Sequence, residues 1–279
     1  MARPFDLVFT DLDGTLLDER SYSFEAALPA LRRLHTLQIP IVFCTSKTIS
    51  ETVAIQERLG LEDPFIVENG GAVYFRPGQL TDATLPIQRS GTWHRLSLGF
   101  SYPRLVSNLL KIQDQLGCVL RGFSDMSASE IAQACGLSME EALRAKDRQF
   151  DEPFSVENET PELMDSLDRV ASEHGLRVTR GGRFHHLTGP NDKGQAVSMV
   201  LGAYARALHG TRCVALGDSP NDLSMLLAVD LPVVVQRPDG SWDPRLLDCL
   251  PNAIKAEGIG PVGWNQAVLA LLGEGGVSG

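Results

Sequence analysis

Short apolar runs and helical periodicities alternate along the first part of the chain. Residues 5–10, 39–44 and 64–67 are short runs rich in β-branched and aromatic side chains, which predicts buried strands. Between them, apolar side chains recur at helical spacing over residues 23–38 and 50–59, which predicts two helices. This alternation of strands and helices is typical of a parallel α/β sheet.

The same alternation returns near the end of the chain. Strands are predicted over residues 213–216 and 231–235, and helices over residues 191–208, 222–229 and 261–272. Residues 83–187 show a less regular mixture of strand-like and helical segments, so we predict an inserted α+β domain there. The predicted fold class is α/β, with a Rossmann-like parallel sheet formed by residues 1–82 and 188–279.

The composition describes an ordinary folded protein and excludes several classes. The chain has 279 residues, of which 43% are hydrophobic and 22% charged, a mixture that argues against disorder. The net charge of -10 argues against nucleic acid or an anionic membrane as a partner, because both require basic surface. No apolar run approaches the roughly 18 residues of a membrane span.

The cysteines and the N-terminus favour a cytoplasmic protein. The five cysteines are odd in number and form no Cys-x-x-Cys pair, which argues against a disulfide framework and fits a reducing compartment. The first residues continue directly into a predicted strand, which argues against a signal peptide. The pattern leaves the oligomeric state open.

Polar motifs follow the predicted strands at the edge where ligands bind in α/β sheets. The chemically relevant side chains in these motifs are Asp11, Asp13, Thr45, Lys47, Lys193, Asp218 and Asp222. Carboxylates gathered at one edge repel one another, and a cation with oxygen ligands such as Mg²⁺ relieves that repulsion. A lysine beside them can bind phosphate oxygens. The motifs therefore predict a site for a divalent cation and a phosphate group.

These motifs, Asp-Leu-Asp-Gly-Thr, Thr-Ser-Lys-Thr, Asp-Lys-Gly and Gly-Asp-Ser-Pro-Asn-Asp, resemble in order those of the haloacid dehalogenase superfamily of phosphatases. The resemblance implies that Asp11 is a nucleophile that forms an aspartyl-phosphate. It implies that Asp13 is the general acid and base, while Thr45 and Lys193 hold the transferred phosphoryl group. It also implies a Mg²⁺ site composed of Asp11, the backbone carbonyl of Asp13 and Asp218, with Asp222 acting through water or by holding Lys193. From the sequence alone, Asp222 could instead cap the helix that follows it.

Four strings narrow the resemblance to one branch of that superfamily. Residues 44–48, 68–72, 148–154 and 181–189 are similar to segments of the mannosyl-3-phosphoglycerate phosphatase family. The resemblance implies a small phosphorylated sugar as substrate, the products mannosylglycerate (a compatible solute) and phosphate, and an inserted domain that acts as a cap. The residues expected to bind substrate are Lys47, Asn69, Arg148, Glu152, Arg183 and His185.

The expected contacts divide by chemistry. Arg183 and Arg148 suit the carboxylate or phosphate, because guanidinium groups bind such anions in a bidentate way. Asn69, Glu152 and His185 are candidates for the sugar hydroxyls. For Arg148 and Glu152, a structural salt bridge is an equally good interpretation. Because His185 and His186 are adjacent on a predicted strand, only one of them can face the cleft.

The distribution of charge is compatible with an anionic substrate. Residues 83–187 carry 12 basic and 14 acidic side chains, whereas the rest of the chain carries 13 and 21. The negative charge is therefore concentrated where the cation is expected. Three other hypotheses stay open: a phosphatase for glucosyl-3-phosphoglycerate or a hexose phosphate, a phosphomutase, and a catalytically silent sugar-phosphate sensor.

Overall fold

The computed structural model describes residues 3–80, 85–181, 183–207 and 211–273, and contains two sheets. The large sheet has nine strands in the order β13-β12-β11-β1-β2-β3-β4-β6-β5. The strands are β1 (Leu7–Thr10), β2 (Ile41–Cys44), β3 (Phe65–Val67), β4 (Ala72–Phe75), β5 (Gln88–Ser90), β6 (Trp93–Ser97), β11 (Cys213–Gly217), β12 (Leu231–Gln236) and β13 (Ile254–Ile259). All pairs from β13 to β3 are parallel, which confirms the predicted fold class.

Helices cover both faces of this sheet because successive strand residues point to opposite sides. Val8 packs in a cluster with α1 (Leu28–Thr36), α2 (Ile49–Leu59) and α10 (Pro261–Leu271). Leu7 and Phe9 pack on the other face with α7 (Lys193–Ala207), α8 (Leu223–Leu227) and α9 (Pro244–Cys249). Both faces of the central strands are therefore apolar, as expected of a parallel sheet.

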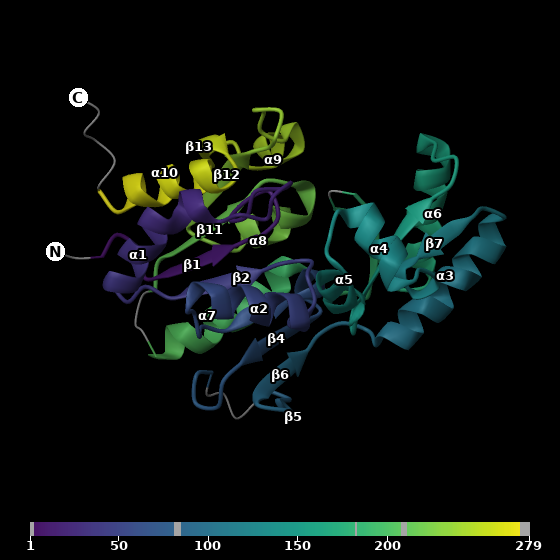
Figure 1. Cartoon of the computed structure of the whole chain (residues 1–279), viewed down its shortest axis with the longest axis horizontal. Helices are drawn as coiled ribbons and strands as arrows, with labels where there is room; N and C mark the ends of the chain where they lie inside the picture. The colour runs from purple at the N-terminus through teal and green to yellow at the C-terminus, as the bar shows by residue number, and fades with distance from the viewer. Residues whose placement is uncertain (1–2, 81–84, 182, 208–210, 274–279) are drawn as a thin grey trace.

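The small sheet is antiparallel and has the order β7-β8-β10-β9. Its strands are β7 (Leu120–Gly122), β8 (Asp151–Val156), β9 (Arg177–Arg180) and β10 (His185–Thr188). On one face, α3 (Tyr102–Leu116) and α6 (Pro161–Glu173) form an apolar cluster with Phe154 and Leu187. We call this sheet, together with α3, α6, α4 (Ala128–Cys135) and α5 (Met139–Lys146), the cap; Figure 1 shows it beside the large sheet.

The start of the predicted insert needs correction. The predicted boundary between residues 82 and 83 lies outside the described residues, as does the predicted end of a helix at residue 208. Strands β5 and β6, however, continue the large sheet, because β6 pairs with β4 from Ala72↔Ser97 to Phe75↔His94. The chain therefore leaves the large sheet only after Ser97. Strands β4 and β13 and helix α9 are further elements that the pattern did not predict.

The strand order also determines where a site can form. Strand β1 lies between β2 and β11, so the connections that leave β1 and its neighbours run to opposite sides of the sheet. A crevice opens at such a switch point, outside the carboxyl ends of the strands. Among the helices that the structure describes, none combines the length and apolar character that a membrane span requires.

Candidate active site

A buried lysine connects two carboxylates at the end of β1. Asp11 follows β1 directly, and its backbone N–H donates to the carbonyl of Leu216 at 3.0 Å. Lys193 is the first residue of α7 and is 1% exposed. Its Nζ lies 2.6 Å from Oδ1 of Asp11 and 2.6 Å from Oδ1 of Asp222. Segments far apart in the sequence therefore meet in one ion-paired group.

The loop after β11 carries Asp222 and one further carboxylate, Asp218. Oδ2 of Asp222 accepts the backbone N–H groups of Asp218 and Ser219, both at 3.1 Å. Oδ1 of Asp218 accepts the hydroxyl of Thr15 at 2.8 Å. Gly14 has a φ of +76°, and a Cβ there would lie 2.9 Å from Oδ2 of Asp218, so glycine allows this turn to pass close to the carboxylate.

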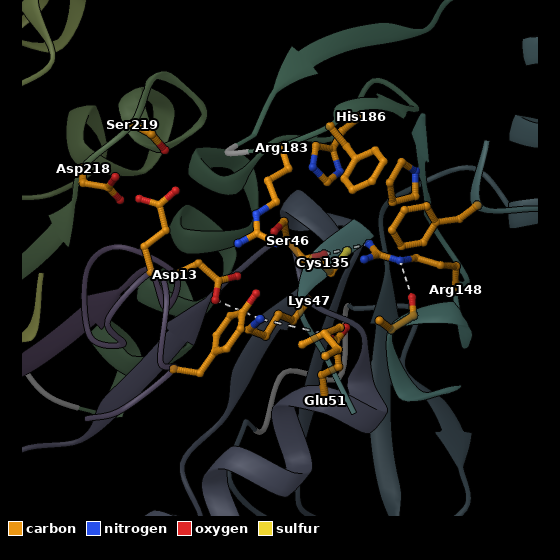
Figure 2. Close-up of a pocket in the computed structure, with 17 residues that line it drawn as sticks. Asp13, Ser46, Lys47, Glu51, Cys135, Arg148, Arg183, His186, Asp218 and Ser219 are labelled. Carbon is orange, nitrogen blue, oxygen red and sulfur yellow. Dashed lines mark hydrogen bonds and ion pairs between the residues drawn. The ribbon is translucent and has the colours of Figure 1, made fainter. Parts of the chain in front are cut away.

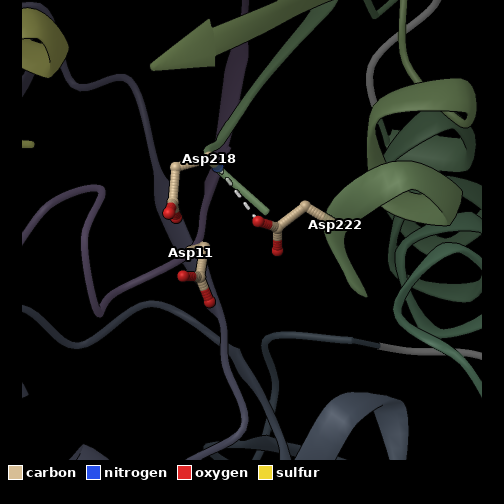
Figure 3. A group of neighbouring side chains, drawn as sticks. All are labelled: Asp11, Asp218 and Asp222. Carbon is tan, nitrogen blue, oxygen red and sulfur yellow. Dashed lines mark hydrogen bonds between the residues drawn. The ribbon is translucent and has the colours of Figure 1, made fainter. Parts of the chain in front are cut away.

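Three of these carboxylates form a candidate metal centre. One ligand oxygen from each of Asp11, Asp218 and Asp222 lies within 4.8 Å of the others (Figure 3). Burial raises the pKa of Asp11 to about 7, although Lys193 opposes that rise. Burial and then the Asp222 charge raise the pKa of Asp218 well above its usual range.

The charge balance favours a divalent cation at this position. Burial disfavours the charged form of Lys193, but Asp11 and Asp222 more than compensate and raise the pKa of its ammonium. One ammonium group thus faces three buried carboxylates, which leaves excess negative charge in a site with low dielectric. Oxygen-only carboxylate ligands suit a hard cation such as Mg²⁺. The residues present therefore fit the predicted metal.

Asp13 does not add its side chain to this group, and the predicted contact of its backbone carbonyl with the cation stays a prediction. Its Oδ1 lies 2.8 Å from Nζ of Lys47, which is also 3.8 Å from Oε1 of Glu51 and above the ring of Tyr22. Burial opposes the charge on Lys47, but Asp13 and Glu51 raise the pKa of its ammonium above the usual value. The ion pair with Lys47 thereby fixes the Asp13 carboxylate beside the cluster of Asp11, Asp218 and Asp222.

Thr45 is fully buried. Its Oγ1 accepts the backbone N–H of Lys47 at 3.1 Å, and its carbonyl accepts the N–H of Asn69 at 3.0 Å. The hydroxyl proton remains able to donate to another group.

A pocket lies between the large sheet and the cap (Figure 2). Of the predicted site residues, its lining includes Asp13, Lys47, Arg148, Arg183 and Asp218. The cap contributes apolar and aromatic side chains, among them Phe123, Pro153 and Phe184. The charged side chains at the strand ends therefore adjoin a surface with both polar and apolar side chains. Such a surface can bind the organic part of a phosphate ester.

The two predicted arginines are used differently. Arg148 lines the pocket, but its guanidinium donates to the carbonyls of Ala145 and Ser46 and lies 3.8 Å from Asp151. Arg183 is exposed, and its Nη1 donates to the carbonyl of Ala134 at 3.1 Å. The contacts of Arg148 therefore favour a structural role, whereas the guanidinium of Arg183 is accessible to a ligand.

Glu152 and His185 do not line the pocket, which corrects their prediction as sugar contacts. Strand residues alternate between faces, and both point toward the cluster under α3 and α6. Glu152 accepts the Oγ and N–H of Ser124 at 2.6 and 3.0 Å, and Nε2 of His185 lies 3.0 Å from Oε2 of Glu159.

His186 is among the pocket residues that sequence reasoning missed. It pairs with Pro153 across β8 and β10, and both line the pocket. The alternation of the strand gave the signal, but the sequence did not show which face was buried. Asn69 does not line the pocket either: its Nδ2 donates to Asp151 at 2.7 Å, which links the large sheet to the cap.

Comparisons with known proteins agree with this geometry. A family model described as haloacid dehalogenase-like hydrolase matches residues 8–91. A protein of Methanococcoides burtonii, named glucosyl-3-phosphoglycerate/mannosyl-3-phosphoglycerate phosphatase, is 40% identical over 268 residues, which cover 96% of this chain and 97% of that protein. This chain belongs to the haloacid dehalogenase-like hydrolases.

One further relative and one solved structure match this haloacid dehalogenase-like hydrolase over nearly its whole length. A protein of Persephonella marina with the same name is 38% identical over 270 residues, covering 96% of this chain and 97% of that protein. A solved structure from Thermoplasma acidophilum has a TM-score of 0.67 at 17% identity and covers 96% of this chain and 98% of that one. At that identity, the second likeness concerns the fold alone.

Proposed function

We propose that this protein is a phosphatase that hydrolyses mannosyl-3-phosphoglycerate, or its glucosyl counterpart. The products are mannosylglycerate, or glucosylglycerate, and phosphate. The observation that carries the proposal is the Lys193 ammonium, which lies 2.6 Å from both Asp11 and Asp222. Asp218 is the third carboxylate of this cluster. The names of the Methanococcoides and Persephonella relatives support both sugars. The pocket under the cap offers a place for the organic part of the ester.

In the proposed reaction, a carboxylate oxygen of Asp11 attacks the phosphorus atom. The bond from phosphorus to the glycerate oxygen breaks, and Asp13 donates a proton to that leaving oxygen. Water then attacks the aspartyl-phosphate and gives a proton to Asp13, so that phosphate leaves and Asp11 is regenerated. Lys193 and the Thr45 hydroxyl stabilise the charge on the phosphoryl oxygens during both steps.

The three grouped carboxylates would hold a divalent cation, proposed to be Mg²⁺. When bound, such a cation supplies positive charge that offsets the negative charge of the phosphoryl group. Asp222 also fixes the loop that carries Asp218, because it accepts two backbone N–H groups there. We further propose that the protein acts in the cytoplasm.

The test is phosphate release from purified protein supplied with mannosyl-3-phosphoglycerate and, separately, glucosyl-3-phosphoglycerate, with and without Mg²⁺. We expect release from at least one of them, dependent on the cation, and none from an Asp11→Asn variant. Phosphate transferred within the substrate instead of released would establish a mutase. No turnover of any phosphate ester would refute the catalytic proposal and favour a sensor.

A further inference from the structure

His186 presents one nitrogen to the pocket and anchors the other. Its Nδ1 lies 2.9 Å from both carboxylate oxygens of Asp151, a residue that is fully buried. Because a carboxylate only accepts hydrogen bonds, Nδ1 carries the proton in this pair. Nε2 has no hydrogen-bond partner among the residues that the structure describes, and His186 lines the pocket (Figure 2). The buried carboxylate of Asp151 thus fixes the orientation of the imidazole.

The anchor itself is fixed from the large sheet. Nδ2 of Asn69 donates to Asp151 at 2.7 Å, and Oδ1 of Asn69 accepts Nδ2 of Asn221 at 3.3 Å. Asn221 belongs to the loop that carries Asp218 and Asp222. A continuous series of hydrogen bonds therefore runs from the metal-binding loop to the imidazole of the cap, so His186 is positioned relative to the reacting groups.

A glycine keeps Nε2 uncovered. Gly181 lies in the turn between β9 and β10, where its N–H donates to the carbonyl of Phe184 at 3.0 Å. A Cβ at this position would lie 2.6 Å from Nε2 of His186, which is closer than real Cβ atoms approach. A side chain at residue 181 would therefore displace the imidazole, which Asp151 holds.

The neighbouring charges indicate which group Nε2 meets. Lys47 is paired with Asp13, and Arg148 lies 3.8 Å from Asp151, so carboxylates of the protein already offset both cations. Arg183 lines the same pocket, and among the described residues its only bonding partner is the carbonyl of Ala134. Its positive charge is therefore available to an anion beside His186.

We propose that His186, oriented by Asp151 and left uncovered by Gly181, binds the carboxylate of the substrate together with Arg183. It does so as an imidazolium, in which Nδ1–H donates to Asp151 and Nε2–H donates to the substrate carboxylate. This rests on the proposed function, since that substrate carries a carboxylate besides its phosphate. His186 is then a specificity residue and Asp151 a positioning residue. A hydrogen bond to a charged group is strong enough to discriminate between ligands that have the carboxylate and ligands that lack it.

The sharpest variant is His186→Asn, because the asparagine amide can still reach Asp151 while nothing replaces Nε2. His185→Asn is the matched control: it removes the neighbouring imidazole, which faces away from the pocket toward Glu159. Gly181→Ala tests the same contact without changing the histidine. Each variant is assayed with mannosyl-3-phosphoglycerate, glucosyl-3-phosphoglycerate and p-nitrophenyl phosphate. 3-Phosphoglycerate and glycerol 3-phosphate serve as competing inhibitors that differ only in the carboxylate.

We expect His186→Asn to raise KM for the sugar phosphoglycerates by roughly 10- to 100-fold with a smaller change in kcat. It should also weaken the preference for 3-phosphoglycerate over glycerol 3-phosphate, which Arg183 then supports alone, while p-nitrophenyl phosphate turnover stays within about twofold. Gly181→Ala should act in the same direction, and Asp151→Asn should add little in the His186→Asn background. His185→Asn should behave as wild type.

Failure of the inference can be told from failure of the proposed function. If wild-type protein hydrolyses neither sugar phosphoglycerate, the proposed function fails, and the two inhibitors alone decide the role of His186. A wild type that does not prefer 3-phosphoglycerate overturns the inference. So does a His186→Asn variant that retains the preference undiminished, or one that loses p-nitrophenyl phosphate turnover to the same extent.

Discussion

Glu68 joins the large sheet to a segment of the cap, and its ionisation leads to a measurable prediction. The residue is fully buried, with a φ of 49°. Its Oε2 accepts the backbone N–H groups of Gln149 and Phe150 at 2.9 and 2.7 Å. These two residues connect α5 to β8. Burial raises the pKa of Glu68 to about 7, although Arg148 and these N–H groups oppose the rise.

The sign of the pH effect follows from that shift. The ordinary pKa is 4.5, so the folded state binds the proton more tightly than the unfolded state. The resulting stability is fully present below pH 4.5 and is lost as the pH rises through about 7. At 1.36 kcal/mol per pKa unit, the free energy of unfolding should fall by about 2.5 kcal/mol between pH 5 and pH 8 through this residue alone.

Glu68→Gln removes this titration while keeping the shape of the side chain. The amide oxygen can take the place of Oε2, but the NH₂ group then faces the N–H of Gln149, so at pH 5 the variant should be less stable than wild type by about 1–2 kcal/mol. By pH 8 the difference should have moved by about 2.5 kcal/mol in favour of the variant. Denaturant unfolding of both proteins at the two pH values measures it, and subtraction removes the contribution of every other titrating group.

Glu130→Gln is a matched control. Hydrogen bonds from Ser127 and Arg121 lower the pKa of this exposed carboxylate to about 2, so its folded state does not titrate between pH 5 and pH 8. Its difference from wild type should stay constant over that range. If the Glu68→Gln difference also stays constant within about 0.5 kcal/mol, or moves the other way, the argument from burial is wrong.

Three predictions concern the catalytic groups. Asp11→Asn should lower kcat by roughly 10⁴-fold or more while circular dichroism shows an unchanged fold, because the amide is a poor nucleophile; substantial residual turnover would contradict covalent catalysis. Lys193→Met should lower kcat by roughly 100-fold or more and destabilise the fold by about 3–5 kcal/mol in denaturant unfolding, because Asp11 and Asp222 lose their buried partner; wild-type values for both would remove its assigned role. Chelation with EDTA should reduce turnover by roughly 100-fold or more, and Mg²⁺ should restore it; full activity in the chelator would exclude a metal requirement.

Local pattern was enough to predict the central part of the sheet and the motifs at its edge. Strands β1, β2 and β3 are short apolar runs, and each ends at a polar motif that sequence alone makes visible. The edge strands were harder, because β5 is mostly exposed and every second residue of β13 is exposed. Their pairing depends on neighbours that lie elsewhere in the chain, so the start of the insert was placed too early.

The sequence by itself determined the fold class, the presence of the acidic motifs and the expectation of a cation and a phosphate. Each of these depends on residue types and on short spacings along the chain, so it can be inferred without knowing the tertiary contacts. Tertiary structure alone decided that Asp13 pairs with Lys47 and that His186 faces the pocket while His185 does not. Both outcomes depend on which face of a strand or turn meets its neighbour, and packing between distant segments sets that orientation.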